Sequence, residues 1–187
     1  MRRGFKAQAE KNAAAARAAL QLAEIAPLDP WEYAAHLNVT ILDFETLGLN
    51  TQVTRQLIEV DASSWSAMTL QEGNAFAIVI NPVHAKVRQR SDLMHELSHI
   101  LLRHVPARVD VAPSKLLLLS DYSDEQEQEA DWQAGALLVP RDGLLRLRSR
   151  RQSAADIAEH FGVSAALCEW RLRMTGVDVQ MRRSTNG

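Results

Sequence analysis

The sequence places two histidines four residues apart, at His95 and His99, with Glu96 directly after the first. In a helix, residues at this separation lie about 40° apart around the axis and one turn apart along it. Two imidazoles so placed can bind one cation, and Glu96 projects beside the pair, where it can hold a water molecule. The pattern therefore requires a helix at this place in the fold and predicts a metal site on it.

The surroundings of this motif favour a metal over two isolated histidines. Random placement of the 6 histidines in this chain would give the five-residue pattern on the order of once per hundred such sequences. Leu93, Met94, Leu97 and the apolar residues 100–102 are distributed around much of the helix, so we expect it to be buried on several sides. Buried imidazoles and carboxylates need partners. One zinc ion per chain is the expected partner, because zinc accepts nitrogen and oxygen ligands.

A catalytic zinc site takes three protein ligands and leaves the fourth position to water, so a third ligand is needed. A metzincin would have glycine and histidine at the positions of Leu102 and Val105, so that class is excluded. His104 follows His95 by nine residues, roughly 180° around a continuing helix, and is expected to point elsewhere. The third ligand is therefore expected on another segment.

The acidic run 124–131 opens a second predicted helix, and one of its glutamates faces the apolar stripe of that helix. Glu127 falls about 35° from the centre of the stripe, whereas Glu125 and Glu129 fall more than about 120° away and are expected to be solvated. An inward carboxylate is costly unless it is paired or coordinates a metal, which makes Glu127 the expected zinc ligand. Asp131, one turn later, is expected to accept a hydrogen bond from a ligand histidine. The alternative is that the acidic run only stabilises the helix N-terminus.

The order of the remaining elements predicts an α+β fold. Val39–Phe44, Ser63–Leu70 and Ala75–Ile80 have strand-like sequences, and the Gly73-Asn74 turn predicts a hairpin between the last two. Leu116–Leu119 is expected either to line a cleft for an extended peptide or to form a buried edge strand. Helices are predicted over residues 5–26, after the Asp29-Pro30 cap, from Asp92 to about His104 with Ser91 as N-cap, from Ser123 to before Pro140, and over 153–161 and 164–174.

The two ends of the chain differ in charge. Residues 1–139 carry 12 Lys and Arg against 18 Asp and Glu, whereas residues 140–187 carry 9 Arg against 5 acidic residues. We expect residues 1–144 to form one domain with a small antiparallel sheet and N-terminal helices, and residues 145–187 to form a small helical region. Five arginines between Arg141 and Arg151 form either a solvated helix face or a docking surface for an acidic partner.

The last predicted helices fit the pattern of a helix-turn-helix around Gly162. The second of them opens with Ala165–Trp170, which is poor in side chains that contact base edges. Direct DNA binding is therefore not expected, and docking of a protein is the favoured role. The single cysteine, Cys168, excludes an internal disulfide and fits a reducing compartment, and no apolar run is long enough for a membrane helix. A cytoplasmic protein is expected.

The chain resembles the ImmA/IrrE-type metallopeptidases. The resemblance rests on the His95–His99 motif, on Glu127 followed by Ala130-Asp131, and on the Leu137–Pro140 ending of the second helix. It extends upstream to Asn81-Pro82 and Arg88-Gln89-Arg90, and to Leu28-Asp29-Pro30 near the N-terminus. The resemblance implies a compact zincin in which His95, His99 and Glu127 are zinc ligands and Glu96 is the catalytic base. It also implies that the substrate is a helix-turn-helix transcriptional repressor.

The expected activity is that of a zinc endopeptidase acting on a regulatory protein. Tyr122 is a candidate donor to the developing oxyanion, and an ordinary core or surface tyrosine is the alternative. A second hypothesis is a transcription-associated protein that binds DNA or a repressor and holds a structural metal. A third is a toxin-antitoxin partner. Three ligands with a free glutamate beside them favour the enzyme, because structural zinc sites are normally closed by four ligands.

Overall fold

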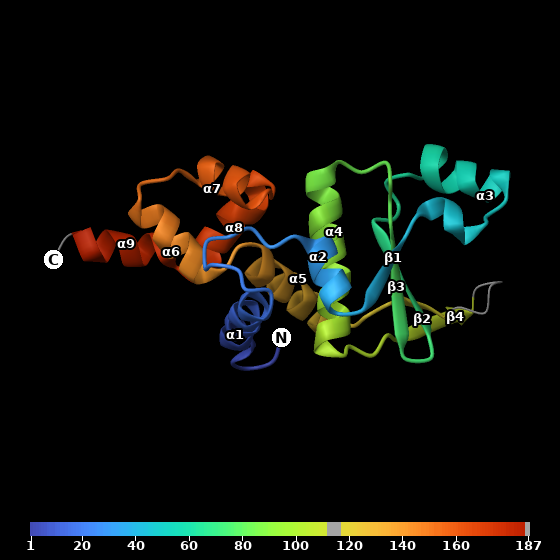
Figure 1. Ribbon diagram of the computed structural model, residues 1–187, viewed down its shortest axis with the longest axis horizontal. Helices are drawn as coiled ribbons and strands as arrows, with labels where there is room; N and C mark the ends of the chain where they lie inside the picture. Colours follow the sequence, from blue (N-terminus) through green and yellow to red (C-terminus); the bar gives the residue numbers. More distant parts are fainter. Residues whose placement is uncertain (112–116, 186–187) are drawn as a thin grey trace.

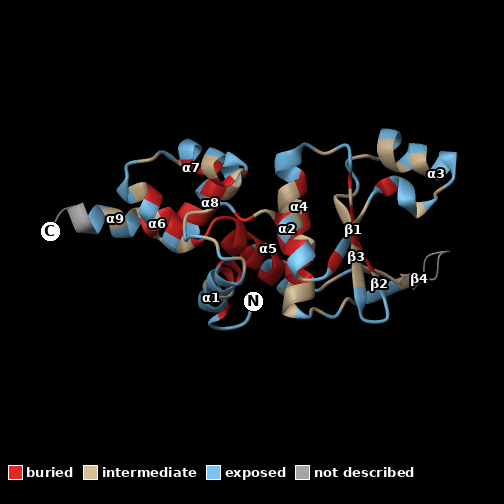
Figure 2. Ribbon diagram, viewed as in Figure 1, coloured by how far each residue is buried: buried red, intermediate tan, exposed pale blue. Residues whose placement is uncertain are grey.

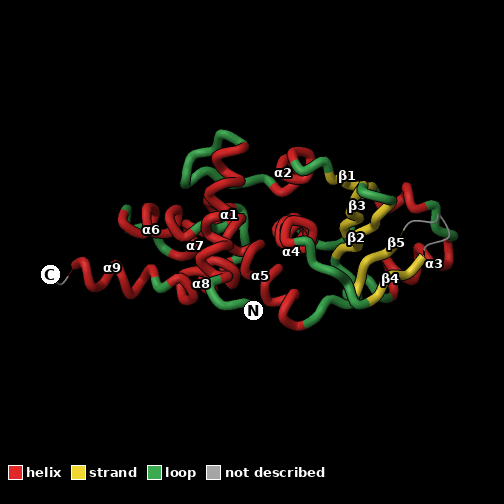
Figure 3. The backbone as a smooth tube through the Cα atoms, turned by 90° about the horizontal axis from the view of Figure 1, so that it is seen from below, coloured by secondary structure: helices red, strands yellow, loops and turns green. Residues whose placement is uncertain are grey.

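Five strands form one mixed sheet within residues 1–111 and 117–185, which the computed structural model describes. β1 runs parallel to β3, and the other neighbouring strands are antiparallel. The hairpin turn between β2 and β3 has Gly73 at φ 57°, a left-handed conformation that glycine adopts without strain. The strands are β1 (Val39–Leu42), β2 (Ala67–Glu72), β3 (Ala75–Ile80), β4 (Arg108–Val111) and β5 (Leu117–Ser120), in the sheet order β1-β3-β2-β5-β4 (Figures 1 and 3).

The two faces of the sheet are covered by different parts of the chain. Successive side chains on a strand point to opposite faces, so Ile78 joins the main core with helix α4 (Lys86–Leu102) and Val79 joins a second cluster. That second cluster is completed by apolar side chains of the segment 44–65. The segment contains η1 (Phe44–Leu47), α3 (Thr51–Arg55) and η2 (Gln56–Val60). Figure 1 shows α4 and α3 on opposite sides of the sheet.

Helix α5 (Asp124–Leu138) lies between α4 and α1 (Phe5–Ala19), and its second half is coloured as buried in Figure 2. Every residue of the range 132–140 is buried. The buried face of α1 repeats every three or four residues through Ala9, Ala13 and Ala16, and these short side chains let α1 pack closely on α5. The core is therefore continuous from the sheet, through α4 and α5, to α1.

The other helices extend this core at both ends of the chain. α2 (Pro30–His36) packs on α4, and α6, α7, α8 and α9 gather at the end of the molecule away from the sheet (Figure 1). Their bounds are α6 (Arg141–Ser149), α7 (Ala154–Phe161), α8 (Ala165–Thr175) and α9 (Val177–Thr185). Helix α6 runs across residue 144, where the sequence predicts a division of the chain, and that division stays a prediction. None of the described helices is long and apolar enough to cross a bilayer.

The predicted α+β class is confirmed, and so are several element boundaries. Asp29 caps α2 by accepting hydrogen bonds from the backbone of Trp31 and Glu32. Ser123 and Gln126 form a capping box at the start of α5. α1 is shorter than predicted and ends at Ala19, because Leu20 caps it and Gln21 adopts a left-handed conformation.

The predicted start of α4 is wrong, because the helix begins at Lys86 and not at Asp92. Ser91 is an interior helical residue whose hydroxyl donates to the carbonyl of Val87. The buried side chain of Gln89 donates to the carbonyls of Asn81 and His84. These bonds satisfy carbonyl groups of the loop before α4, so the helix can begin directly after that loop.

β4 lies between α4 and β5, where the sequence predicts no strand, and β5 is not an edge strand. β5 pairs with β2 on one side and β4 on the other, and its residues Leu117–Ser120 are half-buried. Leu116, the first residue of the predicted segment, lies outside the described residues.

The arginine cluster is partly neutralised within the molecule. Arg146 pairs with Glu24 and Arg148 with Asp178, each at 2.8 Å. Of the two interpretations of the cluster, these intramolecular pairs favour the solvated helix face.

Candidate metal centre

The packing of α4 fixes where its two histidines lie. Leu93, Met94 and Leu97 are fully buried in the main core, which anchors the helix. His95 and His99 project from one edge of it, with their Nε2 atoms 3.0 Å apart. Both rings therefore present the nitrogen farther from the backbone to the same point, and their Nδ1 atoms are left for other partners.

Glu127 reaches the same point from the first turn of α5. The capping box of Ser123 and Gln126 fixes this turn, because the two residues bond each other's backbone N–H groups. The Oε2 atom of Glu127 lies 3.0 Å from Nε2 of His95 and 3.7 Å from Nε2 of His99. Within the described part of the chain, these three side chains form the one group of potential metal ligands, with ligand atoms all within 4.8 Å of one another.

The spacing of these atoms fits zinc. A tetrahedral zinc ion with bonds of about 2.0–2.1 Å separates its ligand atoms by roughly 3.3 Å. The observed separations of 3.0, 3.0 and 3.7 Å bracket that value. Two imidazole nitrogens with one carboxylate oxygen are also the donor set of a catalytic zinc site.

Asp131 supports His95 from the side away from Glu127. Its Oδ1 atom lies 2.9 Å from Nδ1 of His95, the contact that the helical spacing predicts. Burial lowers the pKa of His95, but the hydrogen bond to Asp131 and the charges of Glu96, Asp131 and Glu127 outweigh it and raise the pKa to about 8. The negative surroundings therefore favour a positive charge, a proton or a cation, at this imidazole.

Glu96 is held by the sheet. Thr69 of β2 lies opposite Ile78 in the sheet register, so both side chains face α4. The buried hydroxyl of Thr69 donates a hydrogen bond to Oε2 of Glu96. Burial raises the pKa of the Glu96 carboxyl above its usual range, and the Thr69 bond and the charge of His95 offset only part of this rise. A carboxylate with a raised pKa is suited to take up a proton near neutral pH.

Tyr122 lies flat against one of the candidate ligands. Its ring stacks on the ring of His99 with the centroids 3.8 Å apart. Burial and the charges of Glu96 and Glu127 raise the pKa of Tyr122, so its hydroxyl keeps its proton at neutral pH. The residue is therefore close to the centre as a hydrogen-bond donor, and its role in stabilising an oxyanion stays a prediction.

The expectation that His104 points away from the site is wrong. α4 ends at Leu102, and Arg103 adopts a left-handed conformation with φ 54°, so the chain turns back. Nδ1 of His104 comes within 3.1 Å of Nδ1 of His99. The helical-wheel argument failed because it assumed that the helix continues to residue 104.

The expectation that Glu129 is solvated is also wrong. Its side chain is 3% exposed and pairs with Arg2, from the segment before α1. The stripe used for the prediction describes the face of α5 toward α4, whereas Glu129 is covered by the chain's N-terminal segment. Glu125 is exposed, as predicted.

The structure brings together all the residues that the sequence nominates for the site, although their roles stay predictions. His95, Glu96 and His99 come from α4, and Glu127 and Asp131 come from α5. Tyr122 lies directly before Ser123, the N-cap of α5. Sequence reasoning missed Thr69 and His104. No local pattern identifies Thr69, whereas the chain reversal that positions His104 occurs at Arg103, which carries no glycine or proline signal.

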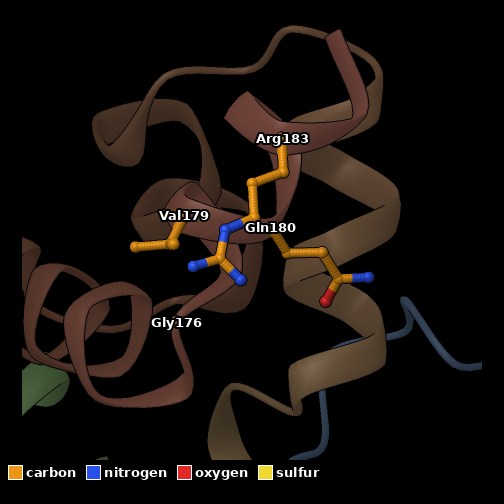
Figure 4. A pocket seen from close by; sticks show the side chains of 4 residues that line it. All are labelled: Gly176, Val179, Gln180 and Arg183. Atoms are coloured by element: carbon orange, nitrogen blue, oxygen red, sulfur yellow. The ribbon is translucent and has the colours of Figure 1, made fainter. Parts of the chain in front are cut away.

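A separate hollow lies at the junction of α8 and α9, at the far end of the molecule from the sheet (Figures 1 and 4). It is open and lined by Gly176, Val179, Gln180 and Arg183, none of which belongs to the candidate centre. The figure shows the Arg183 guanidinium lying over the hollow, beside Gln180.

A comparison with protein families places most of the described core within a known family. The model of peptidase family M78, described as the IrrE N-terminal-like domain, matches residues 62–173. The match begins before β2 and ends in α8, so it includes the whole candidate centre together with α6 and α7. No curated protein and no solved structure matches the chain.

Proposed function

The chain belongs to the ImmA/IrrE peptidase family, whose model covers 112 of its 187 residues, and on this premise we propose that it is a zinc-dependent endopeptidase. His95, His99 and Glu127 would hold the metal and Glu96 would act as general base. The protein would work in the cytoplasm.

The observation that carries this proposal is the convergence of three ligand atoms from two helices. The Nε2 atoms of His95 and His99 and Oε2 of Glu127 have the mutual spacing of three corners of a zinc tetrahedron. One corner is left, and a catalytic zinc site keeps that corner for water or substrate.

When bound, zinc supplies a Lewis acid that polarises a carbonyl group and lowers the pKa of an attacking water molecule. Glu96, oriented by Thr69, would accept the proton of that water and pass it to the leaving amine. Asp131 would keep His95 in one tautomer by accepting a hydrogen bond from its Nδ1–H group. Tyr122 would donate a hydrogen bond from its hydroxyl to the developing oxyanion.

For the substrate we propose a helix-turn-helix transcriptional repressor, as the resemblance to the ImmA/IrrE-type enzymes implies. The C-terminal helices would contribute to docking this protein. Direct binding of DNA by these helices is not part of the proposal, because Arg146 and Arg148 of α6, which could meet phosphate, are paired with Glu24 and Asp178.

The rival function is a regulatory binding protein, or a toxin-antitoxin partner, in which the metal has only a structural role. Glu96 argues for the enzyme. It lies beside the three ligands, desolvation raises the pKa of its carboxyl, and it accepts a hydrogen bond from a hydroxyl of another element. A structural site has no use for such a group.

The test combines metal analysis with proteolysis. The purified chain should contain one zinc ion and should cleave the helix-turn-helix protein with which it is co-expressed, and a chelator should protect that protein. Glu96→Gln should keep the zinc and lose cleavage, and Glu125→Gln, a change of an exposed glutamate, should keep both. Retained cleavage by Glu96→Gln would refute the mechanism. A shift of operator DNA by the chain alone, without cleavage, would favour the rival.

A further inference from the structure

A line of polar side chains runs behind the candidate ligand His99 to the N-terminal segment. Nδ1 of His99 lies 3.1 Å from Nδ1 of His104. The buried Nε2 of His104 lies 3.6 Å from Oε2 of Glu129, an ion-pair distance that is slightly longer than a hydrogen bond. Glu129 in turn accepts hydrogen bonds from the backbone and the guanidinium of Arg2, at 2.8–2.9 Å. This line joins three parts of the chain that lie far apart in the sequence: the end of α4, the middle of α5 and the segment before α1.

The burial of this line separates it from ordinary surface contacts. The side chains of His99, His104 and Glu129 are 1%, 5% and 3% exposed. Arg2, in contrast, is 63% exposed and closes the line toward solvent. Buried polar groups are retained in proteins when they satisfy one another, and each removed partner leaves a cost behind.

The tautomer of each imidazole decides which of its nitrogens donates and which accepts along this line. If Nε2 of His99 binds a metal, the proton of its neutral ring must be on Nδ1, so that Nδ1 donates. Nδ1 of His104 must then accept, which puts the proton of His104 on Nε2, facing the carboxylate of Glu129. The Nε2–H group of His104 then needs an acceptor, and the carboxylate of Glu129, which Arg2 holds in place, is an acceptor.

Resting on the zinc site proposed above, we propose that His104 and Glu129 are positioning residues that hold the ring of His99 in its metal-binding orientation and tautomer. Arg2 fixes Glu129 and thereby couples the N-terminal segment to metal affinity. His95 has the equivalent support from Asp131 alone, at 2.9 Å. The two ligand histidines are thus oriented by different means, one by a surface carboxylate and the other by a buried imidazole-carboxylate pair.

His104 is not itself a fourth ligand in this arrangement. It contacts the Nδ1 atom of His99, whereas the point of convergence lies at the Nε2 atoms of His95 and His99. The fourth corner of the tetrahedron therefore remains available. Apolar packing is the alternative role for His104, because its ring also lies edge-on to His99, with the centroids 5.0 Å apart.

The first experiment measures zinc affinity by competition with a chromophoric chelator, using the full chain stripped of metal. His104→Leu removes the acceptor and should weaken zinc binding about 10–100-fold. His104→Asn keeps an acceptor oxygen where Nδ1 stands and should bind zinc within about threefold of wild type. Arg2→Ala, at an exposed position, should weaken binding roughly two- to fivefold, and Arg3→Ala, its exposed neighbour, should change nothing.

The free energy of unfolding of each metal-free variant separates positioning from packing. If His104 only packs, His104→Leu should keep the zinc affinity of the folded chain, and that result would overturn the inference while leaving the proposed peptidase intact. A wild-type chain that bound no zinc would overturn both proposals. Loss of affinity in His104→Leu with recovery in His104→Asn supports positioning.

A second measurement needs no variant and so does not depend on whether His104→Leu folds. Nitrogen-15 NMR of the zinc-loaded wild-type chain reports which ring nitrogen of each histidine carries the proton. The inference expects the proton of His99 on Nδ1 and that of His104 on Nε2. A His104 ring with its proton on Nδ1 would overturn the inference, since it would then have no acceptor to offer His99.

Discussion

The hydroxyl of Thr69 donates a hydrogen bond to the carboxylate of Glu96, across 27 positions of sequence and from the sheet to the helix. The contact exists because β2 pairs with β3 in a register that turns Thr69 toward α4. One carboxylate oxygen is thereby held, and the other is free of this bond. Orientation of Glu96, the general base of the proposed mechanism, is thus built into the sheet and does not depend on α4 alone.

Replacement of Thr69 by valine should therefore impair turnover without removing the metal. Valine has nearly the same shape, so the packing is kept, while a hydrogen bond to a charged group, worth about 1.5–3 kcal/mol, is lost. We expect kcat to fall roughly 10–100-fold with zinc content unchanged, as measured by steady-state cleavage and metal analysis. Thr69→Ser retains the hydroxyl and is the control. Equal loss of activity in Thr69→Ser and Thr69→Val would show that the hydroxyl is not what matters.

The pKa of His95 predicts how metal binding depends on pH. In the metal-free chain this pKa is raised to about 8, so His95 is protonated at pH 7 and must lose its proton to bind zinc. Burial and the nearby rings of His95 and His104 lower the pKa of His99 to about 3, so this ring is already neutral. Apparent zinc affinity should therefore rise about tenfold per pH unit up to about pH 8 and then level off.

Calorimetry in buffers of different ionisation enthalpy can count the protons released on zinc binding. We expect about one proton at pH 6.5, where His95 is protonated in the metal-free chain. Release of two protons at pH 6.5 would mean that His99 is also protonated in the metal-free chain, contrary to its buried surroundings.

Asp131 offers a test of the support given to His95. Asp131→Asn keeps a hydrogen-bond acceptor but removes a charge that raises the pKa of His95. The pKa of His95 in the metal-free chain should fall below 8, and zinc affinity should fall about tenfold. NMR titration of His95 and chelator competition measure the two effects. Asp124→Asn removes the same charge from the exposed first turn of α5, and an equal effect there would show that Asp131 acts only through its charge on the helix.

The extent to which this centre was predictable follows from how far each residue lies from its partner in sequence. His95, Glu96 and His99 belong to one helix, so the period of 3.6 residues is enough to place them together. Glu127 required a second argument, the cost of an inward carboxylate. The structure brings its carboxylate to both histidines, but the side chain is 43% exposed, so the cost of burial is smaller than that argument supposed.

The same helical-wheel reasoning failed where the helix ended or where a third segment covered it. His104 lies beyond the left-handed turn at Arg103, and Glu129 is covered by Arg2 from the other end of the chain. Both errors have one physical origin. A wheel describes a single helix, whereas the burial of a polar side chain depends on which other segments fold against it.

The prediction of strands from the sequence was limited in a similar way. The β2–β3 hairpin was predictable because Gly73-Asn74 fixes its turn, whereas β4 has no local signal and forms by pairing with β5. Thr69 could be assigned to a strand but not to a face of the sheet, because the face depends on the register of β2 against β3. Thr69 and His104 are therefore two residues of the site that only the three-dimensional structure could identify.

The last prediction concerns the buried pair that ties α1 to α8. The Arg171 side chain is fully buried, donates to the carbonyl of Val139, and pairs with Glu10. Because breaking a buried ion pair leaves an uncompensated charge, Glu10→Ala should destabilise the fold by about 2–4 kcal/mol, somewhat less than for a fully buried partner since Glu10 is 24% exposed. Urea unfolding of the metal-free chain gives the free energy of unfolding directly.

Glu24→Ala is the matched control for this change. It removes a glutamate that also pairs with an arginine, Arg146, but the two side chains are 61% and 56% exposed. An exposed pair contributes about 0–1 kcal/mol, so this variant should unfold close to wild type. If Glu10→Ala were no more destabilising than Glu24→Ala, the Arg171 charge would have to be compensated by other groups. The position of α1 would then depend on its contacts with α5, which are the alanine face and the hydrogen bond of Asn12 to Gln133. A larger loss in Glu10→Ala would instead mean that α1 is held in place by charge as well as by packing.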